Sequence, residues 1–347
     1  MTSETVTGTP ETKTYDGVDT TRRAAWRALV RWESALVVVL IAVLVFGTSK
    51  SANFLDTTNF FYIGLNMGEI AIMALPLMLI VVTGEIDLSV ASMLGLSGTV
   101  VGELFHAGWS IWAAMAVALL VGAAGGLLNG ILVARVGLPS IAVTIGTLTL
   151  FRGIAEIILA PRTITGFPLS LTNIGVIPIQ STEVAWSTVI FLVLAVVFGV
   201  VLHATPLGRR IVTIGLQPEA AQFSGVRVRR IKLGLFVLSG VMCAFAGILL
   251  TLKNASVSYD AGTGLELTVV AIVLLGGVSI FGGRGTVVGV VLAVAIVGCL
   301  QQVLTQMNVQ AEVQNIITGG LLLISVIVPN GGEAIRRLKA RAARRRV

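Results

Sequence analysis

Long runs of apolar residues alternate with short polar segments along most of the chain. A transmembrane helix needs about 20 mainly apolar residues to cross the hydrocarbon layer. Divided at the polar segments, the sequence contains ten candidate spans, near 35–47, 63–83, 88–105, 110–133, 138–160, 184–203, 233–252, 265–281, 286–304 and 313–328. This pattern predicts an all-α, polytopic membrane protein with about ten transmembrane helices.

Glycine is frequent within these spans, with 39 glycines in 347 residues. Small residues let helix backbones approach one another closely in lipid. Gly122, Gly125, Gly126 and Gly130 are spaced along one span and are predicted to face a neighbouring helix.

One long polar segment, residues 204–232, interrupts the apolar runs and contains six basic residues. Within it, Pro218 suits the first position of a helix, and Glu219 places negative charge in the first turn. Gly225 can end that helix in the left-handed conformation, whereas Gln217 is only a mediocre cap. The segment therefore predicts a short helix outside the membrane, which we interpret as a docking element for a partner protein.

The charge distribution predicts an orientation. Apolar residues make up 55% of the chain and charged residues 12%, about half the charged share of soluble domains. With ten alternating spans and an inner N-terminus, 20 of the 24 lysines and arginines fall on inner segments. Because basic segments stay in the cytoplasm, we expect both termini and the central polar loop to be cytoplasmic.

Three regions follow from this division. Residues 1–34 form a basic N-terminal tail that is expected to be disordered, and residues 35–328 form the transmembrane domain. Residues 329–347 form a basic C-terminal tail. Such a tail next to a membrane span is expected to lie on anionic lipid headgroups, and the positive net charge needs no nucleic acid to explain it.

Motifs of soluble enzymes are missing from the sequence. It contains no G-x-x-x-x-G-K-[ST] phosphate-binding loop, no zinc-binding H-E-x-x-H and no G-x-S-x-G nucleophile motif. Cys243 and Cys299 both lie in apolar spans and form no C-x-x-C metal motif. We therefore expect no nucleotide site and no metal site in this chain, and an intramembrane enzyme is disfavoured.

Two polar segments that contain glycine separate spans. In the first, Gly84 permits a tight turn, and Asp87, which precedes Ser89, is placed to cap the next helix. The second contains Gly282, Gly283, Arg284 and Gly285. A phosphate-binding loop is the alternative there, but no strand precedes it and its flanks are apolar. A tight cytoplasmic turn, with its arginine facing headgroups or a partner, is favoured.

Eight polar side chains within the spans are candidates for a transport pathway. Glu69, Arg152 and Glu156 are costly in hydrocarbon, so each should face a cavity or a partner. Arg152 and Glu156 are four residues apart and can pair, either along a pathway or as a structural pair near the outer interface. The neutral candidates are Asn66, Asn129, Thr144, Thr147 and Gln301, and Thr149 and Gln302 are of the same kind. They suit a route for a neutral polyhydroxylated solute, or they hold helices together.

Six short motifs occur in an order that resembles one transporter family. They are Gly84–Ser89, Leu127–Gly130, Thr144–Leu148, Gly208–Arg210, Ile214–Gly225 and Leu275–Thr286. With them, residues 35–328 resemble the permease subunits of ribose-type bacterial ABC sugar importers. Gly166–Pro168 and Gly298–Leu304 are similar to the autoinducer-2 and rhamnose branch. Glu85 departs from the family, which usually has glycine there, so either this turn is looser or Glu85 pairs with a basic residue.

The resemblance implies a mechanism that needs other subunits. Two permease subunits, identical or different, form the pathway, an extracytoplasmic binding protein delivers the sugar to the outer side, and two cytoplasmic ATPase subunits use ATP and Mg²⁺. The outer loop 161–183 is expected to face the binding protein. The family's coupling helix, which docks into the ATPase, corresponds to Gln217, Pro218, Glu219, Ala220, Ala221, Ser224 and Gly225. The alternative is an ion-coupled secondary transporter that uses Glu69, or Arg152 with Glu156.

Overall fold

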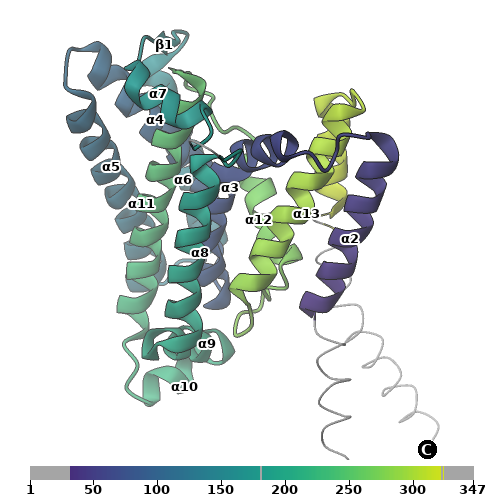
Figure 1. Cartoon of the computed structure of the whole chain (residues 1–347). Coiled ribbons are helices and arrows are strands. Elements are labelled where there is room, and N and C mark those ends of the chain that lie inside the picture. The colour runs from purple at the N-terminus through teal and green to yellow at the C-terminus, as the bar shows by residue number, and fades with distance from the viewer. Residues whose placement is uncertain (1–31, 180–181, 322, 324–347) are drawn as a thin grey trace, which may run out of the picture.

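The computed structural model describes residues 32–179, 182–321 and 323, and it is almost entirely helical (Figure 1). Seven helical segments are long and apolar enough to cross a membrane. They are α2 (Trp32–Lys50), α3 (Thr57–Val82), α5 (Ile111–Ile131) with the π-helix η1 (Leu132–Val136), α6 (Ser140–Leu159), α8 (Trp186–Ala204), α11 (Val228–Asn254) and α13 (Val287–Gln306). They confirm the all-α polytopic class. Most of the two predicted tails lies outside the described residues.

The remaining predicted spans are shorter. Helix α4 (Val90–His106) has 17 residues, and α12 (Leu265–Leu275) has 11. At about 1.5 Å per residue, α12 covers about half of a ~30 Å hydrocarbon layer. The span predicted over 265–281 is therefore wrong in its second half, because Gly276 ends the helix and Gly277 adopts a positive φ of 82°. The last predicted span, 313–328, is described only as a helix up to residue 321.

Helix α3 lies at the centre of the bundle. Every residue from Met67 to Val82 is buried, and Pro76 is accommodated inside the helix. The helix begins at Thr57, before the start predicted near residue 63, and Asp56 in extended conformation precedes it. A helix that is apolar all around its circumference is expected in this position, because it contacts other helices on every side.

Glycines bring α5 and α11 together, as predicted. A Cβ atom added at Gly122 would lie 2.4 Å from the Gly240 carbonyl oxygen, and one at Gly126 would lie 2.3 Å from the Phe236 carbonyl oxygen. Gly130 faces the backbone of Leu233 in the same way. Of the four predicted glycines, these three face α11, whereas Gly125 faces a methionine of α4. The two backbones are in contact along this seam, and no side chain fits between them.

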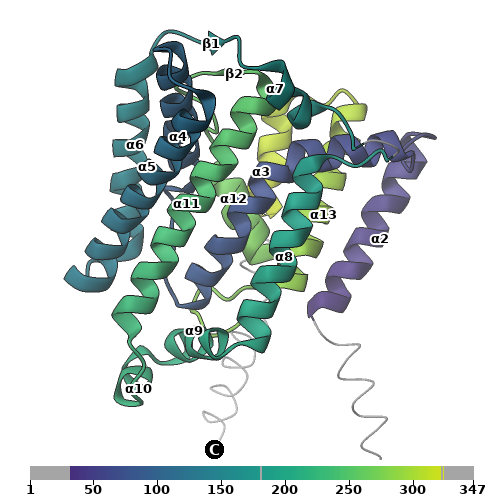
Figure 2. The ribbon, with the colours of Figure 1, turned by 60° about the vertical axis from the view of Figure 1, so that its left-hand side comes forward.

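Short elements gather at the two ends of the bundle. Strands β1 (Ile164–Thr165) and β2 (Ser256–Val257) pair antiparallel and lie with α7 (Leu169–Val176) at one end, which we call the strand end. Helices α9 (Pro206–Leu216) and α10 (Pro218–Phe223) lie at the opposite end, which we call the α10 end. Figure 2 shows α9 running across this end between α8 and α11, and α10 projecting beyond it.

Candidate functional site

The polar segment between α8 and α11 folds into two short helices. Helix α9 is capped by Thr205, whose hydroxyl accepts a hydrogen bond from the Gly208 amide. Extended backbone at Gln217 then ends α9, and α10 begins at Pro218, with Glu219 in its first turn. Gly225 follows α10 with a φ of +81°. The short helix predicted in this segment is confirmed, although Ser224 is its cap rather than its last residue, and Gln217 makes no side-chain capping bond, as its poor rank as a cap implies.

Helix α10 presents a large apolar side chain to solvent. Phe223 is 92% exposed, whereas Ala221 is completely buried against the rest of the chain. An isolated phenylalanine with this exposure gains nothing for folding, and such a side chain is typical of the centre of a protein interface. The predicted set of coupling residues omitted Phe223. Its position in a polar loop, where no core needs it, was the available signal.

The last turn of α9 packs against two backbone turns. A Cβ at Gly215 would lie 1.8 Å from the Val82 carbonyl oxygen and 2.3 Å from the Gly283 amide nitrogen. The same Gly283 amide donates a 2.8 Å hydrogen bond to the Val82 carbonyl. Gly282 and Gly283 both have positive φ, and the neighbouring Arg284 is exposed. The segment between α12 and α13 is therefore a tight turn that touches α9 and the end of α3.

The turn between α3 and α4 contains a buried carboxylate. Asp87 is 3% exposed, and its Oδ1 accepts hydrogen bonds from the amide and the hydroxyl of Ser89. Its Oδ2 accepts a 3.1 Å bond from the Ser239 hydroxyl of α11. The predicted cap is thus wrong in detail: Asp87 bonds the residue that precedes α4, and it bonds α11 rather than the free amides of α4. Gly84, with a φ of 83°, supplies the predicted tight turn.

Three of the candidate pathway residues belong to the surroundings of this turn. Asn129 is buried and donates to the Ser89 hydroxyl, and its own side-chain oxygen has no partner. Thr144 donates to the carbonyls of Ser140 and Ile86. Thr147 is also buried and bonds within its own helix. Asn129 and Thr144 thus connect α5 and α6 to the segment before α4, and the role of all three side chains in a solute pathway stays a prediction.

The charged candidates lie apart from this cluster. Glu69, 3% exposed, forms a 2.8 Å ion pair with Lys253 of α11. Arg152 donates a 2.8 Å bond to the Ala261 carbonyl, in the loop before α12, while Glu156 on its own helix is exposed. The predicted pairing of Arg152 with Glu156 is therefore wrong, because the guanidinium reaches across to the loop instead.

We expect the ion pair in the bundle to be important for stability. Lys253→Met leaves the Glu69 carboxylate buried without its partner, and removing one member of a buried pair costs about 3–5 kcal/mol. The unfolding temperature in detergent should fall clearly, and adding Glu69→Gln should restore part of the loss because it removes the stranded charge. Equal unfolding temperatures for Lys253→Met and the wild type would contradict this role.

A cavity of about 650 Å³ lies between α3, α12, α13 and the helix over 311–321. Asn66 and Gln301 are the two candidate pathway residues that line it. Carboxamides and hydroxyls supply the other polar groups, from Thr263, Thr268, Gln302, Thr305, Gln314, Asn315 and Thr318. No charged side chain lines the cavity among the described residues. Neutral donors and acceptors over apolar walls suit a neutral, hydroxyl-rich solute.

Part of this polar lining was missed at the level of sequence. Gln314, Asn315 and Thr318 lie in the last predicted span at helical spacing, which places them on one side of a helix. That spacing was the signal that could have found them. Gln302 and Gln306 both donate to the Asn59 side chain, at 2.7 and 2.8 Å. They hold α13 against α3 at the strand end of the cavity.

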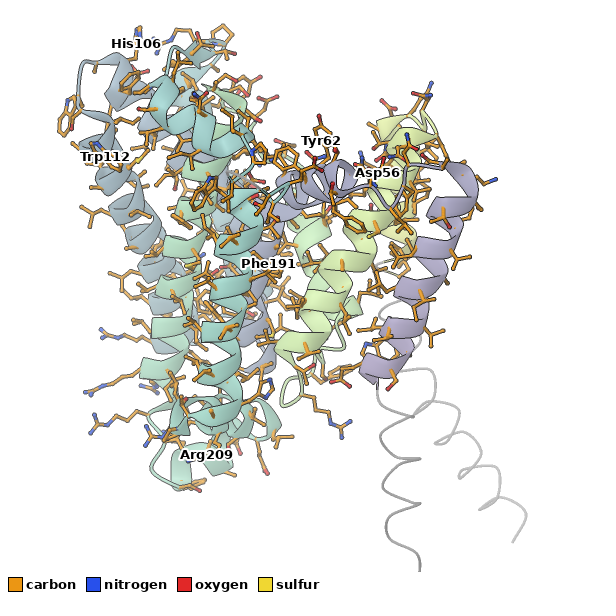
Figure 3. The ribbon with its side chains drawn as sticks, viewed as in Figure 1. Asp56, Tyr62, His106, Trp112, Phe191 and Arg209 are labelled. Carbon is orange, nitrogen blue, oxygen red and sulfur yellow. The ribbon has the colours of Figure 1, made fainter. Side chains whose placement is uncertain are left out.

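At the strand end, a carboxylate connects a loop to the start of α3. Glu183 accepts hydrogen bonds from the hydroxyls of Thr57 and Thr58. These bonds lower the pKa of the Glu183 carboxyl below its usual value. The attachment is therefore complete above the usual glutamate pKa and weakens only as the pH falls below it. Figure 3 labels Asp56, which directly precedes α3, and Tyr62 near the start of that helix.

Membrane-length helices, an uncharged polar cavity between helices and short helices at one end of the bundle are typical of a multi-pass transport protein. The comparisons with known proteins give the family. Residues 59–326 match the family described as the branched-chain amino acid transport system / permease component, and the chain belongs to that family.

Its relatives include permease proteins of similar length. The chain is 32% identical over 320 residues to the autoinducer 2 import system permease protein LsrD of Escherichia coli strain K12. The aligned residues cover 90% of this chain and 96% of the relative. The LsrD proteins of Shigella flexneri and Escherichia coli O157:H7 match to the same extent. No solved structure matches the chain. These matches confirm the resemblance to importer permeases that the motifs indicated.

Proposed function

We propose that this chain is the membrane-spanning subunit of an ATP-binding-cassette importer for a neutral sugar or sugar-like solute. The observation that carries the proposal is α10, a short helix that buries Ala221 against the chain but exposes Phe223 almost completely at one end of the bundle. A permease component needs an energy source, and the sequence has no phosphate-binding loop. A separate ATPase that uses ATP and Mg²⁺ and docks on α10 supplies it.

The α10 end faces the cytoplasm in this proposal. Arg135, Arg209, Arg210, Arg229 and Arg230 all belong to segments at this end. Basic residues next to membrane spans remain on the cytoplasmic side. The same rule supports cytoplasmic termini, because the arginines and lysines of the two predicted tails also lie next to membrane spans. The strand end, with α7 and the loop 161–183, then faces outward and receives a binding protein. A second permease subunit, identical or different, completes the pathway, and two ATPase subunits bind on the cytoplasmic side.

The solute is inferred from the cavity and from the relatives. Amides and hydroxyls line the cavity, and groups of this kind recognise the hydroxyls of a neutral sugar without the cost of desolvating a charge. The name of the LsrD relatives gives autoinducer 2 as the solute of those proteins. A ribose-type sugar, rhamnose or autoinducer 2 is therefore the class of solute that we propose for this chain.

The first test is purification from native membranes in a mild detergent. A tagged chain should bring with it a protein that contains a phosphate-binding loop, in stoichiometric amount, and any second permease subunit. Solute uptake by vesicles that contain the complex should need ATP on the side of the membrane that corresponds to the cytoplasm. Uptake by the purified chain alone, driven by a pH gradient, would overturn the proposal in favour of a secondary transporter.

A second test concerns the role of the cavity in solute uptake. Asn66→Leu combined with Gln301→Leu removes two carboxamides that line it, and each lost hydrogen bond costs about 0.5–1.5 kcal/mol. Uptake at limiting solute should fall about tenfold, while the ATPase still co-purifies. Thr149→Val is the matched control, because Thr149 is exposed on α6 and does not line the cavity. Unchanged uptake in the double variant would exclude this cavity from the pathway.

A further inference from the structure

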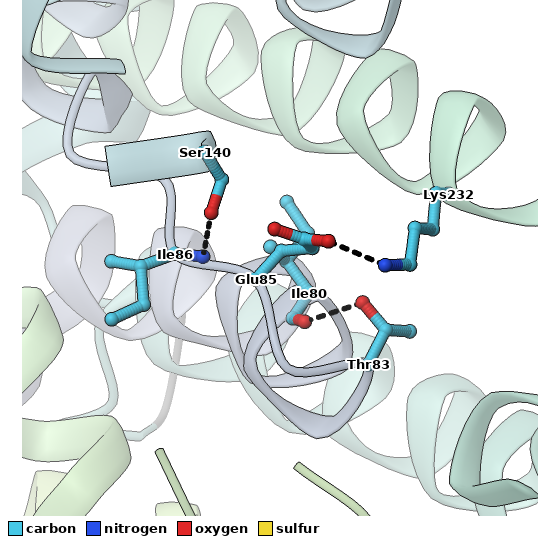
Figure 4. Close-up of polar contacts among 6 residues, drawn as sticks. All are labelled: Ile80, Thr83, Glu85, Ile86, Ser140 and Lys232. Carbon is cyan, nitrogen blue, oxygen red and sulfur yellow. Dashed lines mark hydrogen bonds and ion pairs between the residues drawn. The ribbon is translucent and has the colours of Figure 1, made fainter. Parts of the chain in front are cut away.

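An ion pair joins the α3–α4 turn to the start of α11. Glu85 lies in the turn, and its Oε1 pairs with the Lys232 ammonium group (Figure 4). The two side chains are only 18% and 13% exposed, and 147 residues separate them in the sequence. Of the two expectations for Glu85, a looser turn or a basic partner, the structure shows the basic partner.

The same turn is fixed on its other sides. The Ile86 amide donates a 3.1 Å hydrogen bond to the Ser140 hydroxyl of α6, and Asp87 accepts from Ser239 of α11. Lys232 and Ser239 are seven residues apart, which places them on one face of α11, two turns from each other. Helix α11 therefore holds the turn at two points, through Glu85 and through Asp87.

Lys232 is close in the chain to the docking element. Helix α11 begins at Val228, directly after the loop that follows α10, so Lys232 lies in its second turn. On the other side of the turn, the end of α9 touches the Val82 carbonyl through Gly215. The segment around α9 and α10 is thus joined to the α3–α4 turn by two contacts, the backbone contact at Val82 and the ion pair at Glu85.

The turn leads directly to the cavity. Helix α3 is continuous from Thr57 to Val82, and its residues Ile63, Asn66, Met67 and Ile70 line the cavity. The segment from Met67 to Val82, which contains Pro76, is buried throughout, and close-packed interiors transmit strain. The turn and this wall of the cavity are therefore joined by one helix.

We propose that Glu85 and Lys232 form a positioning pair that transmits the displacement of α9 and α10 to the α3–α4 turn, and through α3 to the cavity. This inference rests on the proposed function, because a partner must move α10. Both side chains are largely shielded from water, so the pair resists separation more than an exposed pair does. Because the ion pair joins the start of α11 to the α3–α4 turn, the positions of these two segments are coupled energetically.

The test uses the complex in vesicles and three measurements: ATPase co-purification, ATP hydrolysis stimulated by the binding protein, and solute uptake. Glu85→Gln and Lys232→Met should each lower uptake about tenfold while the ATPase still co-purifies and hydrolyses ATP. The double variant Glu85→Lys/Lys232→Glu should restore uptake, since it reverses the pair. Lys50→Met, which removes an exposed ammonium group at the end of α2, is the matched control and should change none of the three.

The outcomes separate this inference from the proposed function. If the wild-type chain brings no ATPase, the proposed function fails and the pair is not the cause. If the wild type couples uptake to ATP and both single variants transport normally, the positioning pair is refuted. A fall of the unfolding temperature together with all three measurements, without recovery in the reversed double variant, would show a structural role only and would also overturn the inference.

Discussion

Replacing Phe223 by aspartate is expected to separate this permease from its ATPase. Phe223 is 92% exposed at the end of α10, the proposed docking helix, where a partner would enclose the aromatic ring. Truncating or charging such an interface residue costs about 2–4 kcal/mol, which corresponds to roughly 30- to 1,000-fold weaker binding. Phe223→Asp should therefore abolish co-purification of the ATPase and, with it, ATP-driven uptake.

The exposure of the side chain makes this a clean experiment. Since the ring contacts almost nothing within the chain, the unfolding temperature of Phe223→Asp should match that of the wild type. Phe223→Leu keeps an apolar side chain and should retain most of the binding. Normal uptake by Phe223→Asp would show that the ATPase docks elsewhere, for example on the exposed Phe281 at the same end.

A second change, at the glycine that follows α10, tests the backbone conformation there. Gly225 has a φ of +81° and no atom within 4 Å of an added Cβ. Gly225→Val therefore meets no steric clash, and its effect comes from the unfavourable left-handed conformation of a β-branched residue alone. The chain after α10 should be redirected, with normal insertion into the membrane and reduced uptake. Unchanged uptake would show that the end of α10 does not take part in docking.

Local physics accounts for the parts of this fold that could be predicted. Apolar runs of membrane length, the proline that begins α10 and the glycine that follows it act over a few residues, so the sequence displays them directly. The glycine face of α5 was also predictable, because its spacing shows one side of a helix even when the partner is unknown. The order of the six short motifs indicated, in addition, the class of transporter.

Contacts between distant segments could not be predicted. Asp87 was expected to cap α4 because the next helix is its only neighbour in sequence, but Ser239 lies 152 residues away. Arg152 was expected to bond Glu156 for the same reason, and it bonds Ala261 across the bundle instead. In both cases a long-range partner competes with a local one, and only the packing of α11 and the α12 loop decides between them.

The structure also divides the predicted pathway residues into groups with different surroundings. Asn66 and Gln301 line the cavity, Asn129 and Thr144 bond to the α3–α4 turn, and Glu69 is neutralised by Lys253. A polar residue in an apolar span indicates a need for a partner, but it does not show whether that partner is a solute or another helix. The lining of a cavity makes this distinction, and it requires the assembled bundle.

The seam between α5 and α11 should be the least tolerant part of the molecule. Gly126→Leu places a side chain where the Cβ alone would lie 2.3 Å from the Phe236 carbonyl oxygen, and a helix backbone cannot move aside as a flexible side chain can. Overpacking of a core costs about 1–3 kcal/mol even where neighbours can adjust, and here the two helices must separate along their whole contact. We expect almost no folded protein to be recovered from detergent extracts.

The control for this change is another glycine in a membrane helix. Gly146 of α6 has no atom within 4 Å of an added Cβ, so Gly146→Leu adds the same side chain without a clash and removes the low helix propensity of glycine. It should give as much folded protein as the wild type, measured as the monodisperse fraction in size-exclusion chromatography. Recovery of folded Gly126→Leu at the level of Gly146→Leu would show that the α5–α11 seam is looser than the backbone contacts indicate.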